Sequence, residues 1–179
     1  MLPHITYRQA TPEDTAALIA LINAAFAIEK GKFKTQERID DAELEDYFAR
    51  GVFLVAETAD GPAMVSPREM PACVFVEILS PPAESRSGGV AYFGLLSVSP
   101  EYQRRGLGRE MTLRAEAWAL AQGCHAMELD TLDVRPELPP IYERMGYRIV
   151  SVRPSPVAEW FTQPVKFVRM RKTLKPSPH

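Results

Sequence analysis

The segment at residues 97–111, SVSPEYQRRGLGREM, holds residue types and spacings that could bind a phosphate. Gly106 and Gly108 lie one residue apart, after an apolar run and before an alanine-rich segment. Successive backbone N–H groups at the start of a helix point outward and favour an anion, and glycine lets a backbone approach a phosphate closely. The spacing therefore fits a phosphate-binding turn, and a purely structural turn is the alternative.

Better-known phosphate motifs do not fit this segment. A dinucleotide fingerprint needs a third glycine where the chain has Met111, and a P-loop needs a Lys-Ser/Thr pair that is missing. The adjacent Arg104 and Arg105 could contact nucleic acid, but Glu101 and Glu110 lie beside them. Nucleic-acid-binding domains usually carry a basic excess, whereas this chain has a formal net charge of -2. A small molecule that carries phosphate is the simplest ligand, and we expect no nucleic-acid partner.

Composition places the chain among ordinary globular proteins. It has 179 residues, 46% of them hydrophobic and 25% charged, which predicts one domain over residues 1–174 and a short tail at 175–179. Without a long apolar run or an apolar signal core, we expect a cytoplasmic protein that does not enter membranes. Cys73 and Cys124 lie far apart in apolar surroundings, so we expect buried thiols, no disulfide and, with no metal-ligand spacing, no metal.

The elements that must position the turn can be predicted from periodicity. Strands are expected at residues 5–10, 52–58, 72–79, 90–98, 126–132, 147–153 and 165–174. Helices are expected from the Thr11 cap to Gly31, and at residues 36–51, 109–123 and 139–146. One strand–helix–strand crossover lies in the middle of the chain. The order predicts an α+β fold, with a mixed, mostly antiparallel sheet of about 6–7 strands and about four helices.

Two motifs together resemble those of the GNAT acetyltransferases. Gln103-Arg104-Arg105-Gly106-Leu107-Gly108 is similar to the family pattern Q/R-x-x-G-x-G/A. Downstream, YERMGY at residues 142–147 is similar to the family's Y-E-K-x-G-F/Y, and the order of elements matches from Ile5 to about Leu174. The resemblance implies a GNAT-like acyltransferase fold. It also implies transfer of an acetyl group from acetyl-CoA to a primary amine by direct attack in a ternary complex.

The resemblance also implies where acetyl-CoA binds. The loop at residues 103–108 should hold the pyrophosphate, and nearby arginines should reach the CoA phosphates. The strand at Leu96–Val98 should pair with the pantetheine arm, and a backbone N–H near Leu96 should stabilise the oxyanion. The expected cofactor-binding residues are Leu96, Ser97, Val98, Gln103, Arg104, Arg105, Gly106, Leu107, Gly108 and Arg109.

Tyr142 matches the family's general acid, which protonates the leaving thiolate, and a core tyrosine is the alternative. Glu77, Glu128 and Asp130 are candidate bases, with salt bridges to helix arginines, or a water acting as base, as alternatives. The chain departs from the family at Arg135, where an asparagine is common, and in the Pro139-Pro140 pair that follows. Arg135 could instead serve the cofactor or an acidic substrate group.

Family resemblance implies that the acceptor lies beside the first two helices and the last hairpin. The expected acceptor residues are Phe26, Tyr47, Glu77 and Trp160. The acidic helix at 36–51 could attract a cationic amine, or be a solvated face. A small amine is favoured over a protein amine, and Trp160-Phe161 could form an aromatic wall, a lid or a homodimer contact. The alternative function is a non-catalytic acyl-CoA sensor or interaction module.

Overall fold

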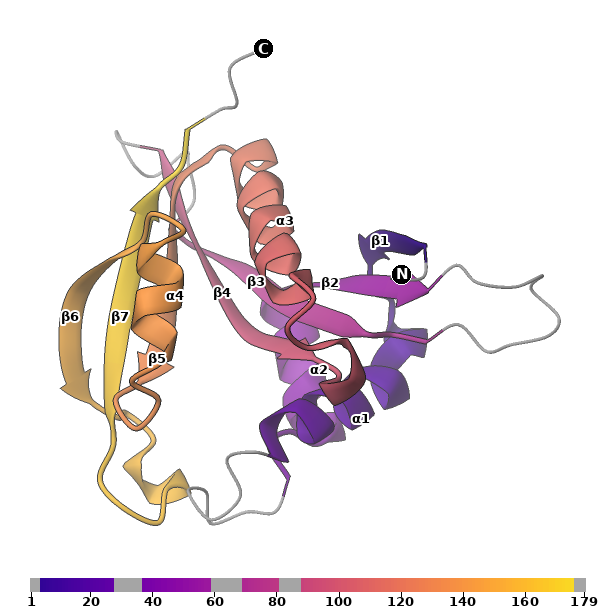
Figure 1. Cartoon of the computed structure of the whole chain (residues 1–179), viewed down its shortest axis with the longest axis horizontal. Helices are drawn as coiled ribbons and strands as arrows, with labels where there is room; N and C mark the ends of the chain where they lie inside the picture. Colours follow the sequence, from indigo (N-terminus) through magenta and orange to yellow (C-terminus); the bar gives the residue numbers. More distant parts are fainter. Residues whose placement is uncertain (1–3, 28–36, 59–68, 81–87, 176–179) are drawn as a thin grey trace, which may run out of the picture. The chain divides into compact units, whose positions relative to one another are not determined.

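The structure, a computed structural model, describes residues 4–27, 37–58, 69–80 and 88–175. Within them the strands and helices follow one another in the order β-α-α-β-β-β-α-β-α-β-β (Figure 1). The strands are β1 (Ile5–Gln9), β2 (Gly51–Thr58), β3 (Ala72–Ser80), β4 (Gly89–Val98), β5 (Cys124–Leu132), β6 (Arg148–Pro154) and β7 (Lys166–Thr173). The helices are α1 (Thr15–Phe26), α2 (Asp41–Arg50), α3 (Leu107–Ala121) and α4 (Leu138–Glu143), with short 3-10 turns η1 (Pro12–Asp14), η4 (Pro100–Tyr102) and η5 (Ala158–Trp160).

The strands form a 7-stranded sheet in the order β1-β2-β3-β4-β5-β7-β6. β1 and β2, β2 and β3, β5 and β7, and β6 and β7 pair antiparallel, whereas β4 and β5 pair parallel. Parallel neighbours need a crossover connection, and α3 supplies it between β4 and β5. The mixed, mostly antiparallel sheet and its helices confirm the predicted α+β class.

The described residues fall into two compact units. Unit one contains the described residues of Met1–Ile28, Glu37–Glu77 and Leu95–Ala115. Unit two contains the described residues of Ile78–Gly94 and Glu116–His179. The boundaries fall inside β3, β4 and α3, and the single domain over residues 1–174 stays a prediction.

Apolar side chains from α1, α2 and three strands form the core of unit one. The sequence predicts Asp14 as the capping-box acid for the Thr11 cap before α1, and the Thr11 N–H does donate to the Asp14 carboxylate, at 2.8 Å. Leu18 and Ile22 are fully buried, as their helical spacing predicts. The buried members of this core are Ala10, Leu18, Leu21, Ile22, Ile39, Leu44, Phe53, Val55, Cys73, Phe75 and Leu95. Cys73 and Cys124 are buried and free, as expected.

Helix α2 begins later than the sequence predicts, at Asp41 rather than near residue 36. Its cap is Asp40, whose side chain accepts a hydrogen bond from the Glu43 N–H at 2.9 Å. Before the cap the chain is not helical, and Asn23 of α1 binds it there: its side-chain oxygen accepts hydrogen bonds from the N–H groups of Arg38 and Ile39. This contact joins residues that are distant in the sequence, so periodicity could not reveal it.

In unit two, β5, β7 and β6 run side by side and present two different faces (Figure 1). Directly opposite residues in an antiparallel ladder share a face, and successive residues alternate. Leu129 pairs with Met170 on one face, and both side chains are buried. Asp130 pairs with Arg169 on the other face, where the side chains are polar and only partly buried.

Helix α3 starts at Leu107, two residues earlier than predicted, and its buried side differs from the predicted one. The sequence suggests an apolar side made of Met111, Leu113, Arg114, Ala117, Trp118, Leu120 and Ala121. Of these, Met111 alone is buried among the described residues of the helix. The buried set is Leu107, Met111, Thr112, Ala115, Glu116 and Ala119, which includes a carboxylate.

The sequence also predicts a long turn over residues 60–71 and a connection over residues 80–89. Most of these two segments, and the expected helix end at Gly31, lie outside the described residues. Within the described part, no helix combines the length and hydropathy that a membrane span requires.

Candidate functional site

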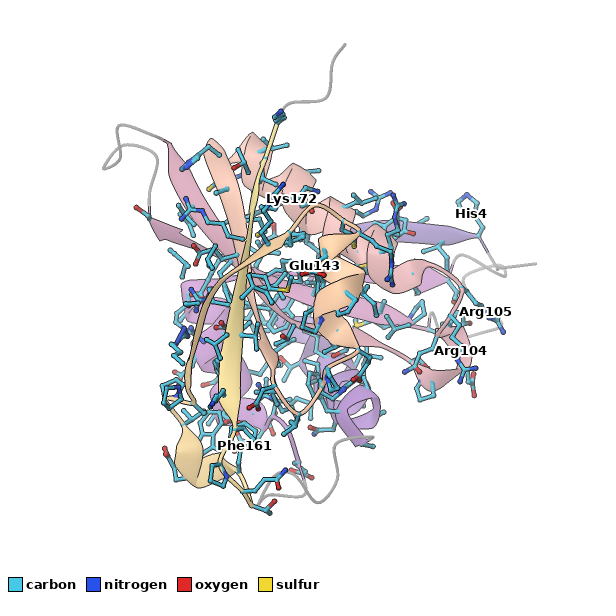
Figure 2. All side chains as sticks on the ribbon, turned by 60° about the vertical axis from the view of Figure 1, so that its left-hand side comes forward. His4, Arg104, Arg105, Glu143, Phe161 and Lys172 are labelled. Atoms are coloured by element: carbon cyan, nitrogen blue, oxygen red, sulfur yellow. The ribbon has the colours of Figure 1, made fainter. Side chains whose placement is uncertain are left out.

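The loop before α3 has the backbone shape expected of an anion-binding turn. Arg104 and Gly106 both have positive φ angles, 59° and 85°. The side chain of Gln103 donates to the backbone oxygen of Val98 at 3.1 Å, which ties the loop to the end of β4. Arg104, Arg105 and Arg109 are exposed, and Figure 2 shows the first two on this loop.

The start of α3 offers hydrogen-bond donors. The Glu110 N–H donates to the Gly106 carbonyl at 3.0 Å and so makes the first helical hydrogen bond. The N–H groups of residues 107–109 precede it and point away from the helix, as helix N-termini do. A Cβ placed on Gly106 would meet no heavy atom within 4 Å, so the space beside this residue is open. The free N–H groups at the start of α3, the exposed arginines and the open space beside Gly106 together suit a pyrophosphate.

Replacing Gly106 and Gly108 separately with alanine should change stability in opposite directions. Gly106 has a left-handed φ of 85°, so a Cβ there should cost about 1–2 kcal/mol even though it meets no neighbour. Gly108 lies within α3, and its Cβ would meet Val98 at an ordinary 3.7 Å, so alanine should stabilise the helix by up to about 1 kcal/mol. Urea unfolding measures both free energies. Equal changes in the two variants would contradict the assigned loop conformation.

The last part of β4 contains a strained residue. Leu95 has a φ of 49°, in the left-handed region that a bulky side chain rarely adopts. Its carbonyl accepts a hydrogen bond from the Ser97 hydroxyl at 3.0 Å. Ser97, one of the expected cofactor residues, is fully buried. Leu96 and Val98 are partly buried, and strain of this kind clusters at functional sites.

Tyr142 lies in an aromatic cluster in unit two. Its ring lies 5.9 Å from those of Phe93 and Tyr147, with tilted and edge-on geometry respectively. The N–H groups of Met145 and Tyr147 both donate to the Tyr142 carbonyl, at 2.9 and 3.1 Å. Burial raises the pKa of Tyr142 to about 12, and the positive charge of Arg135 opposes that rise. Arg135 thus acts on the tyrosine electrostatically while it pairs with Glu137.

A buried carboxylate anchors this cluster, and the sequence did not point to it. Glu116 of α3 is only 7% exposed. It accepts a hydrogen bond from the Tyr147 hydroxyl at 2.8 Å and pairs with the Lys172 ammonium at 2.6 Å. Burial and the Glu116 charge both raise the pKa of Tyr147, so its hydroxyl remains a donor. Lys172 holds Glu116, and Glu116 binds the Tyr147 hydroxyl. Because Tyr147 contacts Tyr142 through its backbone and its ring, this chain of contacts positions the candidate acid.

Glu128 and Asp130, the candidate bases on β5, are both paired with arginines. Arg169 donates to Glu128 at 2.7 Å and to both oxygens of Asp130 at 2.8 and 2.7 Å. Arg171 adds a contact to Glu128, and Arg153 adds one to Asp130. The alternative of salt bridges is therefore found, but the partners come from β6 and β7 and not from helices. The predicted helix partners are wrong because strand pairing, not helix packing, decides which arginines are near.

Within unit two, Tyr142 and the two β5 carboxylates are separated by the sheet. Tyr142 contacts Phe93, whereas Glu128 lies opposite Tyr92, the preceding residue of β4. Successive strand residues point to opposite faces. The structure thus brings Glu128 and Asp130 together but does not bring either to Tyr142.

Three of the expected acceptor residues lie in unit one. Tyr47 and Glu77 are joined by Arg50, which stacks 4.6 Å from the Tyr47 ring centre and pairs with Glu77 at 3.3 Å. Nothing in the pattern of residues around Arg50 predicts this position between Tyr47 and Glu77. Phe26 packs against the core of unit one, and the Arg38 guanidinium lies 5.4 Å from its ring centre. Trp160, the fourth residue, belongs to unit two and is 40% exposed.

No metal site is evident in the described ranges, where no three His, Cys, Asp or Glu side chains are arranged to hold an ion.

Sequence comparison finds one family model that covers much of the chain. The model described as "Acetyltransferase (GNAT) family" matches residues 29–147, about two thirds of the chain. The match includes both motifs, at residues 103–108 and 142–147. No curated protein matches the chain in sequence.

Solved structures with a similar fold cover nearly the whole chain. The ribosomal-protein-S18-alanine N-acetyltransferase from Escherichia coli has a TM-score of 0.70 at 16% identity, with 98% of this chain and 97% of that chain covered. NAA60 from Arabidopsis thaliana, solved with acetyl-CoA, has a TM-score of 0.72 at 16% identity, with 96% and 99% covered. The protein yncA from Salmonella typhimurium, solved with its cofactor acetyl-CoA, has a TM-score of 0.70 at 20% identity, with 98% and 97% covered. At these identities the likeness establishes the fold.

Proposed function

The chain belongs to the acetyltransferase (GNAT) family, and we propose that it transfers an acetyl group from acetyl-CoA to a primary amine by direct attack in a ternary complex. The observation that carries the proposal is the geometry of the loop at residues 103–108. Exposed arginines, the outward N–H groups at the start of α3 and the open space beside Gly106 suit a pyrophosphate. Acetyl-CoA supplies the activated acetyl group when bound.

The end of β4 would guide the pantetheine arm. In this proposal the backbone of Leu96–Val98 hydrogen-bonds to the arm as an added strand would. A backbone N–H near Leu96 donates to the thioester oxygen as negative charge develops on it. The positive φ of Leu95 supports a special role for this point of the strand, because such strain persists only where the surroundings impose it.

Tyr142 would donate a proton to the sulfur, and a base would take one from the amine nitrogen. The two transfers involve different atoms, so an acid and a base on opposite faces of a sheet are compatible with the reaction. Glu128 and Asp130 already accept hydrogen bonds from arginines, so a base role requires those donors to shift. Glu77 likewise pairs with Arg50, and a water molecule is the alternative base.

Release of the CoA thiol from acetyl-CoA, measured with and without a panel of amines, tests the proposal. We expect release that depends on an amine, with small amines favoured over peptide amines. Binding of CoA without thiol release for any amine would favour the alternative function, a sensor or interaction module. Absence of CoA binding would contradict the cofactor assignment to residues 103–108.

We also propose that the protein acts in the cytoplasm and forms a homodimer through Trp160. The 40% exposure of Trp160 supports such a contact, whereas Phe161 is 4% exposed and offers little surface. Light scattering after size-exclusion chromatography, with a Trp160→Ser variant, tests the dimer. A monomeric parent protein would contradict it.

A further inference from the structure

One face of the β5–β7–β6 ladder in unit two is rich in arginine. Asp130 lies opposite Arg169, Glu128 lies opposite Arg171, and Arg171 in turn lies opposite Arg148 of β6. Opposite residues share a face, so all five belong to one side. Arg153 reaches the same side, because its guanidinium pairs with Asp130. We call this set the arginine face: Arg148, Arg153, Arg169, Arg171, Glu128 and Asp130.

The charges of the arginine face do not balance. Four arginines and two carboxylates leave an excess of two positive charges, on a chain whose formal net charge is -2. Arg169 takes most of the carboxylate oxygens, through three hydrogen bonds of 2.7 to 2.8 Å. The two carboxylates therefore neutralise the charge of Arg169 more completely than the charges of the other three arginines.

Arg153 and Arg171 keep donors for a further ligand. Their contacts to Asp130 and Glu128 are longer, 3.3 and 3.2 Å, and both side chains are 39% exposed. A guanidinium has five N–H donors in a planar fork. Because each of these two arginines makes one contact to a carboxylate, several of its donors are available to another oxygen ligand.

The strongest indication of an anion site is that Arg148 lies directly opposite Arg171 on the paired strands. Like charges directly opposite each other on paired strands destabilise the ladder. Arg148 is exposed, and Arg171 shares the Glu128 carboxylate with Arg169. The Nε2 atom of His125 lies 3.5 Å from Arg171, so it adds a further polar atom but no negative charge. A bound oxyanion would relieve the repulsion between the two arginines.

We propose that the arginine face binds a carboxylate or similar oxyanion carried by the acceptor, so that the enzyme prefers amines with an acidic group. The inference rests on the proposed function, since it names the class of its acceptor. Arg148 and Arg171 hold the oxyanion, and Arg153 adds long-range attraction. The preferred charge is opposite to that which the acidic helix α2 would favour.

Pairs of amines that differ in one carboxylate test this selectivity. We would compare kcat/KM for 4-aminobutanoate and butylamine, because their amines have similar basicity. The parent protein should favour 4-aminobutanoate by roughly ten- to a hundredfold, the range expected of hydrogen bonds between charged groups. The variant R148Q/R171Q should bring this ratio close to one. The matched control is Arg114→Gln, which removes a half-exposed, ion-paired arginine of unit one and should preserve the ratio.

The proposed anion site and the proposed acetyl transfer can fail separately in this experiment. Equal kcat/KM for the two amines in the parent, or an unchanged ratio in R148Q/R171Q, would overturn the proposal while leaving acetyl transfer intact. Circular dichroism would verify that the variants are folded. If no amine supports thiol release, the proposed function fails, and calorimetry with the same two amines then tests the arginine face directly. Binding of 4-aminobutanoate that is lost in R148Q/R171Q would support the anion site, and no binding would overturn it.

Discussion

Replacing Tyr142 with phenylalanine should lower kcat by about 10²–10⁴-fold and change the Kd for acetyl-CoA little, as expected for the loss of a general acid. The substitution removes one hydroxyl and keeps the ring that packs against Phe93 and Tyr147. Stopped-flow or steady-state thiol release measures kcat, and calorimetry measures the Kd. The control is Tyr7→Phe, which removes the hydroxyl of a partly buried tyrosine in unit one. Turnover equal to that of the parent would remove the acid role.

The pKa of Tyr142 sets a further condition on this role. At about 12, the phenol stays protonated throughout the neutral range, so its own ionisation should not reduce activity below about pH 11. Such a phenol is, however, a weak donor to a thiolate whose conjugate acid has a pKa near 8.5. Arg135 lowers the pKa of Tyr142 and so improves it as an acid. Arg135→Gln should therefore reduce kcat, and a pH–rate profile to pH 10 should show no loss assignable to Tyr142 in the parent protein.

The arginine that departs from the common family pattern thus has a physical explanation in this structure. The sequence suggested that Arg135 serves the cofactor or an acidic substrate group. Its charge acts on Tyr142 within unit two, which adds a role that neither alternative contained. An asparagine at this position would not lower the pKa of the tyrosine in the same way, because it carries no charge.

Local features of the sequence predicted the fold and the glycine turn before α3. The Thr11 capping box, the alternation of the strands and the crossover between β4 and β5 each depend on residues close in the chain. The same holds for the loop at residues 103–108, where a positive φ at Gly106 follows from glycine in a turn before a helix. Spacing therefore carries enough information for these features.

Features that depend on the register between distant strands could not be predicted. The partners of Glu128 are Arg169 and Arg171, which follow it by about forty residues and reach it only through the β5–β7 ladder. Arg50, the last residue of α2, likewise reaches Glu77 because the next residue, Gly51, lies opposite Glu77 in the β2–β3 pair. A sequence pattern shows that such charges exist, but the pairing of the strands decides which of them meet.

The second large effect should come from Glu116, because it is a buried carboxylate with two partners. Glu116→Ala should lower the free energy of unfolding by about 3–5 kcal/mol, the range for breaking a buried ion pair. The substitution leaves the Lys172 ammonium, whose side chain is 22% exposed, without its carboxylate, and the Tyr147 hydroxyl without its acceptor. Guanidinium unfolding measures the change. The control on the same helix is Glu110→Ala, whose exposed pair with Arg114 should contribute about 0.3–0.5 kcal/mol.

A second substitution separates the cost of an unpaired charge from the cost of lost packing. Replacing both partners, in Glu116→Leu with Lys172→Met, should recover much of the stability, since apolar residues of similar size often substitute well for a buried pair. The double variant should still turn over more slowly than the parent, because the Tyr147 hydroxyl that fixes the ring beside Tyr142 has lost its acceptor. A loss in Glu116→Ala no larger than that in Glu110→Ala would show that the buried pair does not stabilise unit two. Recovery of stability together with full activity would show that the anchoring of Tyr147 does not position Tyr142.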